Sequence, residues 1–76
     1  MSVEQRRGVV LRVAEADYRF GAGPLVLRIE HIDVEHPAEF DGELWYRVRG
    51  VSVGWDGADR GRCDVLIRAT RIPGLR

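Results

Sequence analysis

Aromatic and basic side chains gather in residues 42–55, GELWYRVRGVSVGW, which hold both tryptophans of the 76-residue chain. Apolar residues at Leu44, Tyr46 and Val48 recur with a period of two, which is typical of a strand with one buried face. The opposite face of that strand then presents one aromatic side chain beside two alternating arginines. These outward residues are Trp45, Arg47 and Arg49.

An exposed tryptophan between arginines suits two kinds of partner. Trp, Tyr and Arg are the residue types most enriched as anchors of protein interfaces. The same types can stack on a nucleic-acid base and contact its phosphate. A third interpretation is a solvated face whose arginines pair with acids on neighbouring strands. Three further arginines with outward parity would widen the basic stripe, namely Arg28, Arg62 and Arg68.

Residues 16–24, ADYRFGAGP, form a predicted loop that holds two more aromatic side chains, Tyr18 and Phe20. Because they share parity, they either cap one end of a small core or form an aromatic groove with Trp45 or Trp55.

Residues 30–43, here called the acidic segment, carry six acids and no arginine, whereas both flanking parts of the chain are net positive. This segregation predicts a surface that docks on a basic partner, which could be a second copy of the chain. The acids are Glu30, Asp33, Glu35, Glu39, Asp41 and Glu43.

A metal- or small-ligand site built on His31 and His36 is a weaker alternative. Strand geometry separates His31 from Glu35 by about 13 Å, which is too far for one ion without a kink. No metal-binding spacing occurs, and the single cysteine excludes a cysteine-rich zinc site. The sequence therefore predicts neither a metal nor a cofactor.

Catalysis finds little support in the residue pattern. Cys63 lies in a predicted strand with core parity, which indicates a buried structural thiol. Ser52 has no elbow or oxyanion loop beside it, and the glycines follow no phosphate-binding pattern. We therefore expect a protein that is not an enzyme.

Composition sets the wider limits. The formal net charge is zero, whereas nucleic-acid binders are typically strongly basic. All twelve basic residues are arginine, which is typical of a GC-rich bacterial or phage genome, although selection for bidentate contacts is an alternative. One cysteine, no membrane-length apolar run and no signal-peptide pattern predict a cytoplasmic protein that does not enter a membrane.

Period-two patterns predict four strands, at about 8–15, 25–35, 44–55 and 62–70. The apolar positions change parity between Ile29 and Ile32, which requires a bulge or a sharp bend in the second strand. A similar change after Val48 predicts a bulge at Gly50, which would place Val51, Val53 and Trp55 in the core. Residues 36–43 contain His36-Pro37 and Asp41-Gly42, and are predicted to be a loop.

Bent strands without a covering helix bury their apolar face by curling the sheet into a barrel. The expected fold is a single all-β domain over residues 1–76, ordered over about 8–73, in which a strongly bent antiparallel sheet of four to five strands closes. Its layout over residues 8–74 resembles small SH3-like barrels. The sequence favours a protein-interaction module, which could bind a second copy of itself, over a nucleic-acid-binding barrel.

Overall fold

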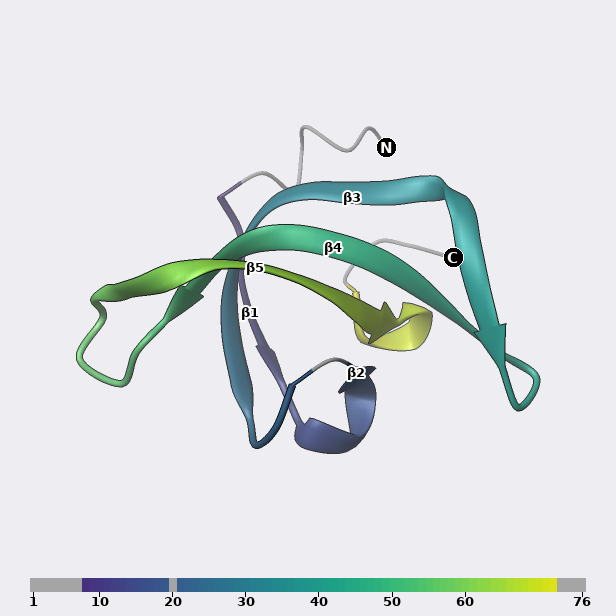
Figure 1. Cartoon of the computed structure of the whole chain (residues 1–76), viewed down its shortest axis with the longest axis horizontal. Coiled ribbons are helices and arrows are strands. Elements are labelled where there is room, and N and C mark those ends of the chain that lie inside the picture. The colour runs from purple at the N-terminus through teal and green to yellow at the C-terminus, as the bar shows by residue number, and fades with distance from the viewer. Residues whose placement is uncertain (1–7, 20, 73–76) are drawn as a thin grey trace.

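The computed structural model describes residues 8–19 and 21–72. Their strands form one antiparallel sheet in the order β1-β3-β4-β5-β2, so the all-β expectation is confirmed (Figure 1). None of the helical segments among these residues has the length and apolarity to cross a membrane. The elements are β1 (Val10–Val13), η2 (Glu15–Asp17), β2 (Tyr18–Arg19), β3 (Leu25–Phe40), β4 (Glu43–Val53), β5 (Asp59–Arg68) and η3 (Ala69–Arg71).

The two edge strands of the sheet are consecutive in the chain. β1 pairs with the start of β3, β2 pairs with the end of β5, and only the short 3₁₀ turn η2 separates β1 from β2. The chain therefore links the two edges, and the sheet is nearly closed into a small SH3-like barrel (Figure 1). The loop expected at residues 16–24 instead contains the end of η2 and the two-residue strand β2, which was not predicted.

The core lies inside the curled sheet and draws on every strand. β-Branched and leucine side chains dominate it, as expected for pleated surfaces that face one another. Leu27, Val48 and Ile67 are completely buried. The core residues are Leu11, Val13, Tyr18, Leu27, Ile29, Ile32, Tyr46, Val48, Val65, Ile67 and Ile72.

The bulge predicted in β3 is confirmed. Its register with β4 shifts between Ile29 and His31, so Glu30 is the extra residue. Ile29 and Ile32 can therefore both point inward, and each is 1% exposed. The shift bends β3 over the core.

The bulge predicted at Gly50 is wrong. β4 keeps an unbroken register with β5 from Trp45 to Ser52, so Gly50 continues the inward row of Val48. A Cβ on Gly50 would overlap the carbonyl oxygen of Arg28 on β3. Glycine is required here because the β3 backbone approaches closely beside its own bulge, whereas β4 itself does not change parity.

Residues 36–43 are mostly strand, which corrects the predicted loop. β3 continues to Phe40, and a second register irregularity between Asp33 and Ala38 accommodates Pro37, which cannot donate a ladder hydrogen bond. The turn predicted at Asp41-Gly42 is confirmed, with φ of 53° and 80°, as in the tight primed turns of hairpins. β3 bends sharply where this irregularity lies (Figure 1).

Candidate functional site

The predicted arginine stripe occupies the outer face of the sheet, defined here as the outward rows across β3, β4 and β5. Strand pairing places Arg47 between Asp33 and Leu66, and Arg49 between His31 and Asp64. The rows on either side continue the pattern, so the predicted parity of these side chains holds. Those rows are Arg28–Val51–Arg62 and Ala38–Trp45–Arg68.

Most arginines of the outer face are already paired. Arg28 contacts Asp59 at 2.8 Å, and this hydrogen bond raises the pKa of Arg28 and lowers that of Asp59. The pair of Arg47 with Asp64 at 3.6 Å links the neighbouring strands β4 and β5, whereas the pair of Arg62 with Glu30 at 2.7 Å joins β5 to β3 across β4. Arg68 binds Asp17 and Glu43. Among the described residues, Arg49 alone on this face contacts no carboxylate.

Trp45 is buried, so its predicted exposure is wrong although its parity is right. Only 4% of it is accessible. Phe40 packs edge-on against its ring at a centroid distance of 6.2 Å. The guanidinium groups of Arg68 and Arg19 lie 4.7 and 5.1 Å from the ring centroid. The bend of β3 and the β2 segment bring these covering groups over the outer face, which parity alone cannot predict.

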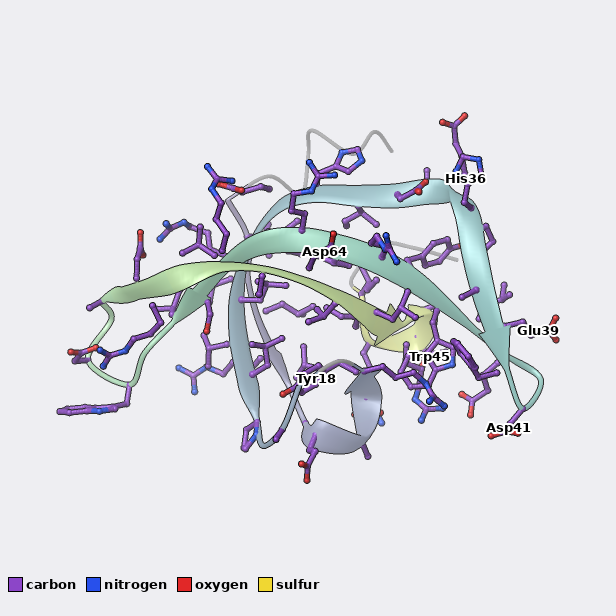
Figure 2. The ribbon with its side chains drawn as sticks, in the orientation of Figure 1. Tyr18, His36, Glu39, Asp41, Trp45 and Asp64 are labelled. Carbon is purple, nitrogen blue, oxygen red and sulfur yellow. The ribbon has the colours of Figure 1, made fainter. Side chains whose placement is uncertain are left out.

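The indole nitrogen of Trp45 is buried without a hydrogen-bond partner in the described part of the chain. Figure 2 shows Tyr18 directed inward, whereas His36, Glu39 and Asp41 point away from the body of the molecule. Trp45 therefore acts as packing in the structure and is not available to a partner.

The exposure of Trp55 is also predicted wrongly, in the opposite sense. It was expected in the core, but it is 95% exposed. β4 ends at Val53, and residues 54–58, here called the Trp55 loop, connect it to β5. Gly54 before the tryptophan and Asp56-Gly57 after it are turn signals that could have placed Trp55 outside the strand.

Hydrogen bonds hold the Trp55 loop in one shape. The amides of Gly54 and Gly57 donate to the carbonyls of Ala58 and Gly54, at 2.8 and 3.0 Å. Asp56 Oδ1 accepts from the backbone amide of Ala58 and from the Arg60 guanidinium, each at 3.1 Å. This network fixes the backbone on both sides of an indole that is left in water.

Arg60 also restrains the loop by packing. A Cβ on Gly54 would overlap its guanidinium, so the side chain lies directly against that glycine. Gly57 adopts φ 81°, a conformation that favours glycine and reverses the chain. The loop is thus built to hold Trp55 outward, and β4 and β5 carry it to one end of the molecule (Figure 1).

The acidic segment is partly neutralised. Glu30 and Glu43 pair with arginines, and Asp33 contacts His36 at 3.3 Å. Within residues 8–19 and 21–72, the other three acids contact no basic side chain; they are Glu35, Glu39 and Asp41. Glu39 and Asp41 lie at the β3–β4 hairpin, at the opposite end of the molecule from the Trp55 loop (Figures 1 and 2).

Tyr18 caps the core, as one of the two sequence interpretations predicts. It is 7% exposed, and its hydroxyl donates to the carbonyl of Gly23 at 2.7 Å. Burial, aided by the charge of Glu15, raises its pKa. Phe20 lies outside the described residues, so the aromatic groove remains a prediction for that side chain.

The candidate catalytic and metal residues stay apart. Cys63 is half-buried against the core, and burial followed by the charge of Asp64 raises the pKa of its thiol, which disfavours the reactive thiolate. His31 lies on the outer face beside Arg49 and takes no part in the His36–Asp33 contact. Across the described chain, no three histidine, cysteine or acidic side chains group as metal ligands would.

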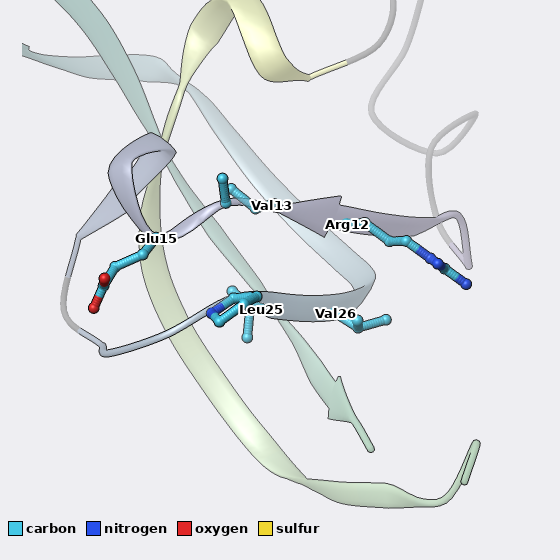
Figure 3. Close-up of a pocket in the computed structure, with 7 residues that line it drawn as sticks. Arg12, Val13, Glu15, Leu25 and Val26 are labelled. Atoms are coloured by element: carbon cyan, nitrogen blue, oxygen red, sulfur yellow. The ribbon is translucent and has the colours of Figure 1, made fainter. Parts of the chain in front are cut away.

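An open hollow lies between the end of β1 and the start of β3 (Figure 3). Its volume is about 400 Å³, and its lining is mainly apolar. The residues around it, here called the β1–β3 hollow, are Arg12, Val13, Ala14, Glu15, Pro24, Leu25 and Val26.

Comparison with known proteins matches the chain to no family model, no curated protein and no solved structure.

Proposed function

We propose that this chain is a non-enzymatic protein-interaction module whose principal contact residue is Trp55. The observation that carries the proposal is an indole that is 95% exposed on a loop fixed by its own hydrogen bonds. Tryptophan is among the commonest anchors of protein interfaces. A loop that is already ordered loses little conformational freedom when it binds, which favours affinity.

The outer face and the acidic segment take secondary roles in this proposal. Arg28, Arg47 and Arg62 satisfy acids of their own sheet, so a partner would have to compete for them. The same pairing weakens the nucleic-acid alternative, since phosphate contact depends on free positive charge. Glu35, Glu39 and Asp41 keep free charge that can steer a basic partner toward the surface.

The absence of an enzymatic role is part of the proposal. The raised pKa of the Cys63 thiol supports it, because the reactive thiolate is disfavoured. A reducing cytoplasmic compartment fits the lone free cysteine.

Quantitative affinity capture tests the proposed function. Wild type, Trp55→Ala and Leu44→Ala serve as baits after nuclease treatment; Leu44 is an exposed apolar residue outside the Trp55 loop and is the matched control. We expect wild type and Leu44→Ala to enrich the same proteins. Trp55→Ala should lose them, with dissociation constants at least about 30-fold higher, as for a typical anchor residue. Equal enrichment by all three baits would show that Trp55 is not the contact.

A further inference from the structure

The β1–β3 hollow is an open, mainly apolar depression that an indole ring from another molecule could contact. Its volume of about 400 Å³ falls in the lower part of the range of roughly 300–1,000 Å³ that ligand pockets occupy. Leu25 and Val26, which are half-buried, supply its apolar walls, whereas Val13 belongs to the core and is only 3% exposed. The hollow is open to solvent, so a side chain from another molecule can enter it (Figure 3).

The chain's own tryptophans do not fill this hollow. Trp55 is 95% exposed, and Trp45 is enclosed by Phe40, Arg19 and Arg68. Each copy therefore presents one unburied indole and one unfilled apolar hollow.

The charges around the two features are complementary. Arg12 and Glu15 stand at the hollow; neither has an ion-pair partner in the described part of the chain, although Glu15 accepts a hydrogen bond from the Gly23 amide at 2.8 Å. Asp56 and Arg60 flank Trp55, are exposed, and pair with each other at 3.1 Å. An acid and an arginine beside the indole can thus meet an arginine and an acid beside the hollow.

We propose that Trp55 of one copy inserts into the β1–β3 hollow of a second copy, with Asp56 and Arg60 facing Arg12 and Glu15. The same contact made twice about a two-fold axis closes a dimer, which is the commonest symmetric assembly. This inference rests on the proposed function, in which Trp55 is the contact residue, and adds the identity of the partner.

Sedimentation velocity over a concentration series tests the inference, with circular dichroism to verify that each variant folds. Trp55→Ala removes the anchor. Ala14→Trp fills the hollow from an exposed position in extended backbone, with φ −69° and ψ 154°, and Ala16→Trp is the matched control outside the hollow. Wild type and Ala16→Trp should dimerise alike, whereas the dissociation constant of each of the other two variants should rise at least about 30-fold.

Mixing the two disrupted variants gives the most specific result. Trp55→Ala retains an intact hollow, and Ala14→Trp retains an intact anchor, so one of the two contacts can form between them. We expect the mixture to associate more tightly than either variant alone.

Undiminished dimerisation of Trp55→Ala, or a mixture that associates no better than its components, would overturn the inference. A wild-type chain that stays monomeric at millimolar concentration would overturn it too. If that monomer captured a different protein through Trp55, the proposed function would stand while the second copy would be excluded as the partner.

Discussion

At the scale of single residues, Trp55 has the highest exposed fraction among the large apolar side chains of the described chain, and burying it would contribute most to binding. Burying an aromatic side chain removes about 150–250 Å² from water, which corresponds to roughly 4–6 kcal/mol at 25 cal/mol per Å². The cost of association reduces this gain. The remainder still makes Trp55 the residue whose removal should weaken binding most.

Trp45, the other tryptophan of the chain, has a structural role because it is buried. Its unpaired indole nitrogen costs about 1–3 kcal/mol. Arg19 and Arg68 stack on its ring, and such cation–π contacts contribute about 0.5–2 kcal/mol each. The stacking and the burial of the ring offset the cost of the missing hydrogen bond. Trp45 therefore contributes to stability by packing against the two arginines.

Gly50 is the position where one added methyl group should do most damage to the fold. Gly50→Ala would place its Cβ against the Arg28 carbonyl of β3, and backbone cannot move aside as a flexible side chain can. We expect the free energy of unfolding to fall by about 1–3 kcal/mol or more, the range of overpacked cores. Urea denaturation measures the change.

Ser52→Ala is the control for Gly50→Ala, because Ser52 lies two residues further along β4 and is half-buried. It should remain within about 0.5–1 kcal/mol of wild type. If Gly50→Ala were equally stable, the close approach of β3 and β4 would be wrong.

At the scale of elements, an irregularity in a strand could be predicted only where it changes the alternation of apolar residues. The bulge in β3 changes parity between Ile29 and Ile32, and was therefore visible in the sequence. The segment around Pro37 was predicted to be a loop, because a bulged strand and a turn can both be rich in proline and charged residues. The bulge at Gly50 was wrongly predicted because the glycine is required by a contact with another strand. The Arg28 carbonyl of β3, which lies close to Gly50, is distant in sequence and leaves no local signal.

The two tryptophans lie near opposite ends of β4, and their exposure depends on what surrounds each end of the strand. Parity placed the Trp45 side chain on the correct face, but its covering groups come from β2, β3 and β5. These contacts depend on how the sheet closes and leave no local signal. Trp55 was assigned to the core because a parity change was predicted at Gly50 and the alternation was then continued two residues beyond the true end of the strand at Val53.

The Trp55 loop should lose its order when Asp56 is removed. Asp56→Ala leaves the amide of Ala58 and the guanidinium of Arg60 without their acceptor. Hydrogen exchange should then accelerate at the Ala58 amide. Binding through Trp55 should also weaken, although the indole itself is intact, because ordering the loop now opposes association.

Asp59→Ala is a suitable control for Asp56→Ala, since Asp59 pairs with Arg28 at the base of the hairpin and supplies no bond to the loop. It should leave exchange at Ala58 unchanged. Unaltered exchange in Asp56→Ala would mean that the Asp56 bonds do not order the loop.

At the scale of the whole molecule, the two hairpins lie at opposite ends of a body 35 Å long (Figure 1). One end carries the exposed indole, and the other carries Glu39 and Asp41. The barrel between them has a thin core, since a chain of this size buries only about 60% of its unfolded surface. Burial of Trp55 in a partner would therefore add stability that the isolated chain lacks.

The central claim is that Trp55, and not Trp45, is the tryptophan free to meet a partner. Acrylamide quenching of the two single-tryptophan variants tests it most directly, at a concentration low enough to keep the chain monomeric. In Trp45→Phe the remaining Trp55 should emit as an indole in water and be quenched readily, whereas in Trp55→Phe the remaining Trp45 should emit further to the blue and be protected. Equal protection of both tryptophans, or a protected Trp55, would contradict the account.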